Sequence, residues 1–537
     1  MRIPSRRLRS RPEHLLALWL GACGDDGEAA TTSDAPSGAG DLDTSPDSTG
    51  ASDVSDPSNP SSSGDPTGQG TDTAPDDTGP GDDTGDPPPP PDCGDATCSA
   101  LETCSSCADD CGACPSDCAD PAVLCVDASG MQAEFATIQD AADAAIPGDT
   151  VLVFAGSYEG FDISASGEPE LRISYRAADD GVVIDAPSAG DGCSGDPTGI
   201  CIVGSDELAG VHDVVVEGFT IVDMGRSCVA SHSANPGVSG VASPHLRLVL
   251  RGLRCERAGH EGLYLSEVGA SLVEGNEVVD AGANGEDRGH GIYMANAGCD
   301  DTVIRGNVIH WDDALGPAEG AGIHFNGDLS VEGDGGGDGV ITGLVVERNM
   351  IWGSSHNGFN MDGVRSSRIA DNVVYGNGRN ALVVYAIDAA GGAADLQIVG
   401  NTFVVPDFGT GAAIRLEQDE GGHVIVDNIL VNHGGGPSIS LGDAPFTSDY
   451  NALVDVFAID EEDVDVGAWQ AGGHDTHSIV VDGAGLFVGP TDFHLVDGAA
   501  PIDAGIDVLG GVAASAIDLE GAPRPQGAGY DIGAYER

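Results

Sequence analysis

The sequence of 537 residues contains no lysine, so all 21 of its basic side chains are arginine. Schiff-base chemistry, a lysine general base and a phosphate-loop lysine are therefore excluded. The 88 acidic residues give a formal net charge of -67, which excludes binding to nucleic acid along the whole chain, because phosphate neutralisation needs a basic surface. Beyond the first two dozen residues no apolar run is long enough to span a membrane, so a multi-pass membrane protein is excluded.

The first residues have the pattern of an export signal. Five arginines precede His14, an apolar stretch runs from Leu15 to Ala22, and Cys23 follows small residues. The sequence Leu20-Gly21-Ala22-Cys23 resembles a bacterial lipobox, which implies that residues 1–22 are a signal peptide and that Cys23 is acylated. The resemblance predicts an outer-membrane lipoprotein that is held by its lipid anchor alone and faces the periplasm or the cell surface. The alternative is an ordinary signal peptide with a chance cysteine.

Residues 23–92 are predicted to form a disordered linker. From residue 24 to 92 the sequence is almost wholly Asp, Ser, Thr, Gly, Pro and Ala, with 17 acidic residues and no basic one. Such a composition cannot bury enough apolar area to offset the entropy lost on ordering. We expect a spacer without chemistry of its own.

A cluster of eight cysteines follows in residues 93–126, and two Cys-x-x-Cys pairs within it raise the question of zinc. Only three residues separate the two pairs, whereas zinc ribbons place about fifteen or more between theirs, and an exported protein meets an oxidising compartment. The cluster resembles small cysteine-rich modules of secreted bacterial lipoproteins. We predict disulfides, with a connectivity that the sequence leaves open, among Cys93, Cys98, Cys104, Cys107, Cys111, Cys114, Cys118 and Cys125.

From about residue 130 the sequence predicts a repeating all-β structure. Short Val- and Ile-rich strands are separated by Gly, Asn and Asp, and similar segments return in steps of 23 to 42 residues. Steps of such varying length predict a solenoid of about nine to eleven strand-rich coils with loops of different length.

Two columns of equivalent residues are predicted to stack along the solenoid at about 4.8 Å per step. The first is an asparagine ladder in a turn, where we expect the asparagines to adopt an unusual backbone angle and to bond to their neighbours above and below. Its members are Asn276, Asn307, Asn349, Asn372, Asn401 and Asn428. The second column alternates in charge and predicts outward-facing ion pairs among Glu217, Arg251, Glu274, Arg305 and Glu347.

Five further cysteines lie in the repeat region. Cys228 and Cys255 are one coil apart, which favours a bridge between stacked coils. Cys193 and Cys201 are predicted to pair locally, which leaves Cys299 unpaired.

The segment from Phe135 to Val153 is predicted to be an amphipathic capping helix, a Pro-Gly turn and a strand. It closely resembles the opening of right-handed parallel β-helix proteins of the pectate-lyase-like superfamily, and Asp531 to Glu536 resembles the terminal segment common in bacterial members. The resemblance implies an all-β fold, a right-handed parallel β-helix over residues 130–500 with an N-terminal capping helix. It also implies an irregular C-terminal tail over residues 501–537. We expect a monomer.

A second strand of each coil repeats as Gly-apolar-X-apolar-X, and alternation sends both X side chains outward. The first outward column is Tyr264, Tyr293, His324, Asn360, Val383 and Arg415. The second is Ser266, Ala295, Asn326, Asp362, Tyr385 and Glu417. Polar, titratable and aromatic groups therefore gather on one face of the middle coils, in steps that suit an extended polymer.

β-Elimination or epimerisation of a uronate needs a base, an acid and a group that neutralises the carboxylate. The predicted catalytic residues for this chemistry are His290, His324, Tyr293, Asp362 and Arg379. The predicted substrate-binding residues are Asn326, Asp328, Asn360, Tyr385, Asp388 and Arg415, of which Tyr385 could also be the acid and Arg415 the neutralising group. Inverting hydrolysis would instead use a pair of carboxylates drawn from Asp328, Asp362 and Asp388.

The absence of lysine argues against a hydrolase of the polygalacturonase family. Gly289-His290-Gly291 resembles the Gly-His-Gly element of polygalacturonases, but the Arg-Ile-Lys element of that family cannot exist in a chain without lysine.

No cofactor is required by these patterns, but calcium is a candidate. The glycine-rich loop from Gly327 to Gly343 carries Asp328, Asp334 and Asp338, whose carboxylates could bind the ion. The spacing matches no calcium motif, so a solvated loop is the alternative.

Taken together, the patterns predict an envelope protein whose β-helix binds and modifies a polysaccharide, by lyase or epimerase chemistry ahead of hydrolysis. The alternative is a non-catalytic surface module that binds carbohydrate or mediates adhesion. The acidity of the chain counts against a polyuronate substrate unless local arginines or calcium hold it, so a neutral glycan stays an equal prediction.

Overall fold

The computed structural model describes residues 110, 115–130, 133–190, 193, 196–203, 210–232, 245–285, 289–295, 299–312, 320–327, 339–442 and 444–537. The predicted signal peptide, Cys23, the linker and Cys93, Cys98, Cys104, Cys107, Cys111 and Cys114 lie outside these residues, as do Asp328, Asp334 and Asp338. Within the described part, no helix has the length and apolarity that a membrane crossing needs.

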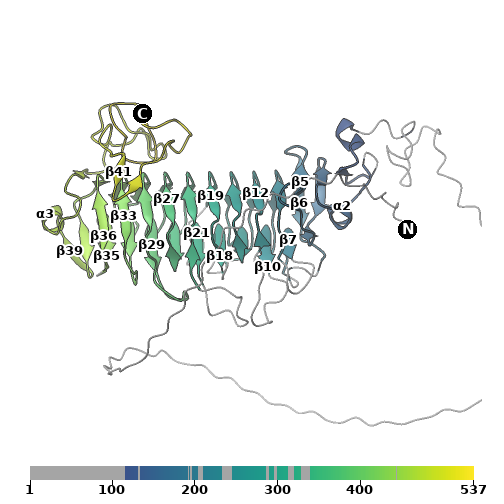
Figure 1. The fold of residues 1–537 in the computed structure, drawn as a ribbon, viewed down its shortest axis with the longest axis horizontal. Helices are drawn as coiled ribbons and strands as arrows, with labels where there is room; N and C mark the ends of the chain where they lie inside the picture. Colours follow the sequence, from purple (N-terminus) through teal and green to yellow (C-terminus); the bar gives the residue numbers. More distant parts are fainter. Residues whose placement is uncertain are drawn as a thin grey trace, which may run out of the picture. The chain divides into compact units, whose positions relative to one another are not determined.

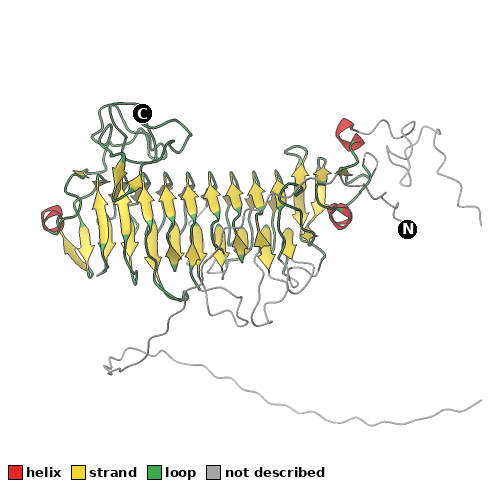
Figure 2. Cartoon of the chain, viewed as in Figure 1, coloured by secondary structure: helices red, strands yellow, loops and turns green. Residues whose placement is uncertain are grey.

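Three long sheets of twelve strands each run side by side as a right-handed parallel β-helix, which confirms the predicted fold (Figures 1 and 2). Successive strands of the chain pass from one sheet to the next, so that each coil contributes one strand to each sheet. Apolar residues alternate along the strands and point into a single core that extends through the coils.

The bounds of the strands are as follows. Sheet 1 comprises β1 (Val123–Val126), β2 (Thr150–Val153), β5 (Ile173–Ala177), β8 (Val214–Glu217), β12 (Val249–Arg251), β16 (Leu272–Glu274), β19 (Val303–Arg305), β23 (Val345–Glu347), β27 (Arg368–Ala370), β30 (Gln397–Val399), β33 (His423–Val426) and β36 (Phe446–Asp449). Sheet 2 comprises β3 (Gly156–Glu159), β6 (Val182–Ala186), β9 (Thr220–Val222), β13 (Arg254–Glu256), β17 (Glu277–Val279), β20 (Val308–His310), β24 (Met350–Trp352), β28 (Val373–Tyr375), β31 (Thr402–Val405), β34 (Ile429–Asn432), β37 (Ala452–Leu453) and β40 (Ile479–Val480). Sheet 3 comprises β4 (Phe161–Ile163), β7 (Ile200–Val203), β10 (Val229–His232), β14 (Leu263–Ser266), β18 (Ile292–Ala295), β21 (Ile323–Asn326), β25 (Phe359–Asp362), β29 (Leu382–Tyr385), β32 (Ile414–Leu416), β35 (Ile439–Leu441), β38 (Phe457–Ile459) and the antiparallel β39 (Glu462–Val464).

The remaining elements are short. Three two-stranded pairs are β11 (His245–Leu246) with β15 (Val268–Gly269), β22 (Ile341–Thr342) with β26 (Val364–Arg365), and β41 (Val508–Leu509) with β42 (Val512–Ala513). The helices with bounds among the described residues are η1 (Ser116–Ala119), α2 (Ile138–Ala144) and α3 (Val466–Ala471).

The asparagine ladder forms as predicted, at the turn between sheets 1 and 2. Each fully buried member donates to the side-chain oxygen of the next, as Asn276 Nδ2 does to Asn307 Oδ1 at 2.9 Å. The ladder extends one step beyond the prediction to Asn451, whose Nδ2 donates to the carboxylate of Asp475 at 2.9 Å. The predicted backbone angle is wrong: the positive φ belongs to the residue before each asparagine, such as Gly275 at 62° or Arg348 at 56°.

The charged column is confirmed for two pairs, whereas its last predicted member, Glu347, pairs with the adjacent Arg348. The disulfides predicted within the repeat region are confirmed. Arg251 Nη2 lies 3.0 Å from Glu217 Oε2, and Arg305 Nε lies 2.7 Å from Glu274 Oε1. The disulfides join Cys118 to Cys125, Cys193 to Cys201 and Cys228 to Cys255, while Cys299 is free and buried.

Helix α2 closes the core near its N-terminal end. Thr137 caps the helix by accepting from the backbone N–H of Asp140 at 3.1 Å, and Ile138 and Ala141 are buried beneath it. Strand β1 lies before α2, within the range 93–126 that the sequence assigned to the cysteine module, and pairs in parallel with β2. Sheet 1 therefore has one strand more than the largest number of coils predicted.

The C-terminal tail folds back over sheet 2. Ile532 and Ala534 pack on the outward-facing Val373 and Ile429. The tail is also held by Arg524, whose guanidinium is 2.9 Å from Asp371 of the solenoid and 3.1 Å from Glu536. All three side chains of this ion-pair network are buried, so each charge depends on its partners.

Asp427 gives a pH test of this docking. Its Oδ1 accepts the backbone N–H of Ile506 in the tail at 3.0 Å, while its buried Oδ2 has no partner among the described residues. Burial raises the pKa of Asp427 from 3.8 to about 7, against the opposing charge of Arg524. Because the folded state holds this proton more tightly, the stabilisation is fully present below about pH 4 and is lost as the pH rises through about 7.

Asn at this position cannot ionise. We therefore expect the stability of the Asp427→Asn variant to increase relative to that of the wild type as the pH rises. The measurement is the difference between the two thermal unfolding midpoints at about pH 5 and about pH 8, on either side of the raised pKa. Using the difference cancels the titration of the other carboxyls. If the difference between the two midpoints does not change with pH, the pKa of Asp427 is not raised in the folded protein.

Candidate functional site

The outer face of sheet 3 carries both predicted columns in register. Tyr264 pairs with Tyr293, Tyr293 with His324 and His324 with Asn360, and the column continues through Val383 to Arg415. The second column runs in register from Ser266 to Tyr385, and Glu417 lies just beyond the end of β32. The strand alternation therefore places the predicted side chains on one face, as expected.

Two of these side chains, His324 and Tyr385, form a directed hydrogen-bond chain with His290, which lies just before β18. We call these three residues the relay. The backbone N–H of Ala321 donates to His290 Nδ1 at 2.9 Å, so the neutral His290 ring carries its proton on Nε2. That Nε2 lies 3.1 Å from His324 Nδ1, which must accept. His324 then carries its own proton on Nε2, 3.1 Å from the hydroxyl oxygen of Tyr385.

The direction of the relay leaves the hydroxyl proton of Tyr385 free to point away from His324. His290 is buried, whereas His324 and Tyr385 are half-buried on the face. Burial raises the pKa of Tyr385 well above its usual range, and the carboxylate of Asp362 raises it further. Tyr385 is therefore protonated, as a proton donor must be, although the raised pKa also makes it a weaker acid.

Tyr293 lies beside the relay. Its ring centroid is 5.1 Å from that of His290 and 4.9 Å from that of His324. Asn326 Nδ2 lies 3.1 Å from the Tyr293 hydroxyl, while the buried Asn326 Oδ1 has no hydrogen-bond partner among the described residues. Asn326 is therefore held beside Tyr293 with a buried acceptor that does not reach the surface of the face.

A hollow of about 420 Å³ adjoins the relay on the C-terminal side. Its lining residues are His356, Asn357, Asn360, Arg379, Asn380, Val383, Tyr385, Ile387, Arg415, Glu417 and Gln418. The predicted Asn360, Arg379, Tyr385 and Arg415 therefore meet in one place.

His356 faces two hydrogen-bond donors in this hollow. Arg379 Nη1 lies 2.9 Å from its Nε2, and Asn357 Nδ2 lies 2.8 Å from its Nδ1. The amide of Asn357 cannot turn round easily, because its Oδ1 accepts the backbone N–H of Asn380 at 3.0 Å. Burial, with the charge of Arg379, lowers the pKa of His356 to about 4. His356 is therefore neutral, so one ring nitrogen accepts from the donor that faces it, while the other ring nitrogen carries the proton and faces a donor that it cannot accept from.

Arg379 and Arg415 differ in their freedom to bind an anion. Arg415 is ion-paired with Glu417. Arg379 is exposed and has no ion pair with a carboxylate among the described residues; the imidazole of His356 is the acceptor that it contacts. Arg379 is thus the better candidate for holding a negatively charged substrate group.

The predicted carboxylates are less available. Asp362 is buried and accepts the backbone N–H groups of Ile387 at 3.1 Å and Asp388 at 2.9 Å. Burial raises the pKa of Asp362. Its carboxylate anchors the loop after β29, whereas Asp388 is exposed on that loop. No group of three or more metal-binding side chains occurs in the part of the chain that the structure describes.

Sequence reasoning missed His356 and Asn380. Both precede strands of sheet 3 rather than lying on them, so strand alternation did not find them. A signal existed, because Asn357 and Asn380 are 23 residues apart, which equals the shortest repeat step, and they are linked by hydrogen bonds.

Comparisons with known proteins agree with the fold. A family model for a right-handed β-helix region matches residues 248–452. No curated protein matches the sequence. Among solved structures, pectate lyase Pel9A is 14% identical, with 74% of this chain and 90% of that chain covered and a TM-score of 0.45. An alginate lyase from Paenibacillus sp. str. FPU-7 is 17% identical, with coverages of 58% and 94% and a TM-score of 0.42. PfbA, a surface adhesin of Streptococcus pneumoniae, is 11% identical, with coverages of 59% and 80% and a TM-score of 0.43. Likenesses at these levels carry no information about activity.

Proposed function

We propose that this protein binds an extended polysaccharide along the outer face of sheet 3 and modifies it by proton transfer, as a lyase or an epimerase. The observation that carries the proposal is the relay, which ends in the phenolic O–H of Tyr385 in the lining of the hollow. The same hollow holds the neutral imidazole of His356 and Arg379, which has no carboxylate partner among the residues that the structure describes. An acid, a base and a neutralising cation are the three groups that this chemistry needs.

The polysaccharide would run along the solenoid. Neighbouring strands are about 4.8 Å apart, which is close to the length of one sugar unit, so successive sugars meet successive strands. Tyr264 and Tyr293 lie on one side of His324, and Asn360 and Arg415 lie on the other.

Substrate binding would change the state of His356. Burial is the main cause of the lowered pKa of His356 and the charge of Arg379 is the second. A substrate carboxylate that pairs with Arg379 takes over the guanidinium N–H groups and neutralises this second contribution. The imidazole then has a free lone pair and a higher pKa. His356 therefore becomes a base only when the substrate carboxylate, which is attached to the reacting carbon, is bound to Arg379.

In β-elimination, His356 takes the proton on the carbon next to the carboxylate. The electron pair forms a carbon–carbon double bond, the glycosidic carbon–oxygen bond breaks, and the leaving oxygen takes the proton of Tyr385. The Nε2–H of His324 stabilises the resulting phenolate. In epimerisation the same proton leaves one face of the sugar, and Tyr385 returns a proton to the opposite face.

Hydrolysis finds less support in this face. It needs two carboxylates that flank the bond with room for a water molecule. Asp362 is committed to backbone N–H groups, Asp388 is exposed on a loop, and Glu417 is paired with Arg415.

The proposal is tested with a panel of polygalacturonate, alginate and a neutral glucan, each with and without calcium. Turnover is recorded as the absorbance of unsaturated uronates, as new reducing ends and, for epimerisation, as exchange of the sugar carbon-bound proton with deuterated water. We expect turnover of one panel member that is lost in His324→Ala and retained in His433→Ala, an exposed histidine after β34. Binding without turnover would instead identify a non-catalytic carbohydrate-binding module.

A further inference from the structure

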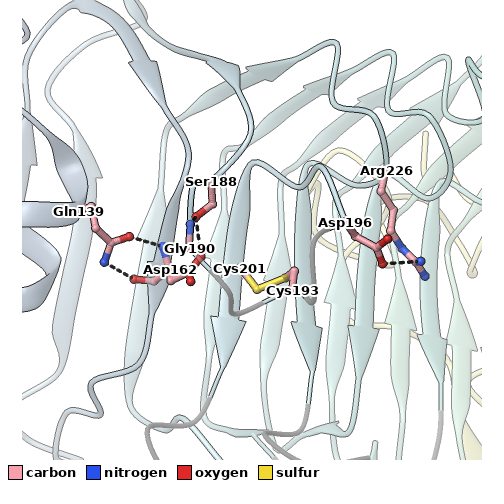
Figure 3. The surroundings of a disulfide bond; sticks show 8 residues. All are labelled: Gln139, Asp162, Ser188, Gly190, Cys193, Asp196, Cys201 and Arg226. Carbon is pink, nitrogen blue, oxygen red and sulfur yellow. Dashed lines mark hydrogen bonds and ion pairs between the residues drawn. A yellow bond between two sulfur atoms is a disulfide. The ribbon is translucent and has the colours of Figure 1, made fainter. Parts of the chain in front are cut away.

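The arginines beside sheet 3 determine how many substrate carboxylates its outer face can hold. Four described arginines lie on the strands of this sheet or in the turns that lead into them from sheet 2: Arg226, Arg257, Arg379 and Arg415. Arg226 is paired with Asp196 at 2.8 Å, as Figure 3 shows. Arg257 is paired with Asp223 at 2.7 Å. Both of these guanidinium groups are therefore neutralised by carboxylates of the chain itself.

The other two arginines, Arg379 and Arg415, both line the hollow beside the relay. Arg379 lies in the turn before β29, and Arg415 lies on β32, the neighbouring strand of the sheet. Neighbouring strands are about 4.8 Å apart, and a homopolymer of uronates carries a carboxylate on every sugar, at about the same interval. If Arg379 binds one carboxylate, Arg415 is therefore the cation that would have to bind the next one.

Arg415 is already occupied by Glu417. Glu417 Oε1 contacts both Nε and Nη2 of Arg415, so two nitrogens of the guanidinium are committed to one carboxylate. Asp388, next to Ile387 of the lining, adds a further negative charge on the exposed loop after β29. A second substrate carboxylate would therefore meet a guanidinium that is already neutralised, and it would be repelled by the carboxylates beside it.

On the other side of His324 the face carries aromatic rings. Tyr293 and then Tyr264 follow in register with His324. An aromatic ring offers a large apolar surface and a partially negative face, which suits an uncharged sugar better than a carboxylate. The guanidinium of Arg226 lies 5.3 Å from the ring centroid of Tyr264, but it is the one paired with Asp196. Among the described residues of this face, Arg379 is thus the one guanidinium without a carboxylate partner.

We infer that the substrate is a heteropolysaccharide in which each uronate is flanked by neutral sugars, and that Glu417 sets this specificity by occupying Arg415. The inference rests on the function proposed above and specifies its substrate class. The uronate binds at Arg379, beside Tyr385. Neutral sugars lie along Tyr293 on one side of it and along the neutralised Arg415 on the other. The formal net charge of -67 acts in the same direction, because it repels a polymer more strongly the more carboxylates the polymer carries.

The substrate class is tested by changing the charge density of a single backbone. Activation with a carbodiimide, followed by borohydride reduction, converts a chosen fraction of the carboxylates of polygalacturonate or alginate into neutral hydroxymethyl groups. Turnover per remaining uronate is measured at each degree of reduction, with EDTA present so that calcium bridges contribute nothing. We expect this rate to rise as the uronates become isolated, and turnover to end when no uronate remains.

The outcomes of this series separate the two proposals. A rate per uronate that stays constant, or that falls from the first degree of reduction, would overturn the inference. The proposed function would stand in that case, because the homopolymer itself is turned over. If neither polymer is turned over at any degree of reduction, the proposed function fails and the inference fails with it.

Glu417→Gln tests the residue that sets the specificity. The variant frees Arg415 for a second substrate carboxylate and removes a repelling charge. We therefore expect kcat/KM for the unreduced polymer, divided by kcat/KM for the half-reduced polymer, to rise about two- to five-fold, the range that a surface ion pair supplies. A partial loss of folded protein lowers both values equally and leaves this ratio unchanged.

Glu217→Gln is the matched control. Glu217 pairs with Arg251 on sheet 1 at 3.0 Å, and this pair is exposed to a similar degree as the pair of Glu417 and Arg415. The control removes the same single charge from the chain and also frees an arginine, but on another face, so the ratio should stay at the wild-type value. An unchanged ratio in Glu417→Gln, or an equal rise in both variants, would overturn the role of Glu417.

Discussion

Replacing Tyr385 by phenylalanine is expected to lower turnover of the glycan by about 10²- to 10⁴-fold, the usual contribution of a positioned general acid. The ring still fills its place on β29, but the O–H that faces the hollow is gone and the Nε2–H of His324 has no oxygen to stabilise. Glycan affinity should change little, because the phenol acts mainly on the leaving group. The measurement is kcat with KM, together with the Kd of an uncleaved oligosaccharide.

Tyr375→Phe is the matched control for this prediction. Tyr375 stacks on Trp352 along the outer face of sheet 2, with ring centroids 5.5 Å apart, and is remote in the coil from the relay. Its variant should retain full turnover. Equal losses in both variants, or a loss in Tyr385→Phe that appears only as weaker binding, would show that Tyr385 is not the proton donor.

Replacing Asn372 by alanine is expected to destabilise the fold by about 3 to 6 kcal/mol, because several buried groups lose their partners at about 1 to 3 kcal/mol each. Asn372 Oδ1 accepts from Asn349 N and Nδ2 at 2.9 and 3.0 Å. Its Nδ2 donates to the Val346 carbonyl and to Asn401 Oδ1, both at 2.9 Å. The substitution removes all four bonds at once in a fully buried turn.

Arg305→Ala provides the comparison, because it removes an ion pair with Glu274 that is about one-third exposed and is worth about 0.2 to 1 kcal/mol. The measurement is the midpoint of unfolding in guanidinium chloride for both variants and the wild type. A loss in Asn372→Ala no larger than that in Arg305→Ala would mean that solvent replaces the broken ladder bonds.

The fold could be predicted from sequence because its signals are local and repeated. Asn276, Asn307 and Asn349 recur at the same place relative to an apolar pair. A misalignment of any one repeat would have broken this regular recurrence, so the alignment of the repeats is well defined. The same regularity placed Tyr293 and His324 next to each other on one face. A repeat fixes the register, and the register fixes which outward side chains are neighbours.

The chemistry of the site could not be predicted in the same way. His290 and His324 were both candidate catalytic residues, and only the structure shows that the backbone N–H of Ala321 in the next coil engages Nδ1 of His290, which under the proposed function makes it a positioning residue for His324. His356 was missed because its role depends on Arg379, which reaches it from a neighbouring turn. Such contacts depend on how turns of different length are placed, which the strand pattern does not specify.

The position of the disulfide between Cys193 and Cys201 could not be predicted from the strand pattern either. The spacing of Cys193 and Cys201 predicted a local disulfide correctly. It gave no sign that the bridge lies over the outward face of sheet 3, because that depends on where the connection between β6 and β7 runs.

The asparagine ladder also has an electrical direction. From Asn276 to Asn428, one N–H of each amide donates to the next asparagine toward the C-terminal end, and the other donates to a backbone carbonyl of the preceding coil. Each side-chain oxygen accepts from the N-terminal side, so the C=O dipoles add along the solenoid as peptide dipoles add along a helix. The positive end of this row falls at Asn451, where the buried carboxylate of Asp475 receives it. Trp469 Nε1 and Ser478 Oγ donate to the same carboxylate, at 2.8 and 2.6 Å. The solenoid thus places a counter-charge at the positive end of its own line of dipoles, and this polarity distinguishes its two ends.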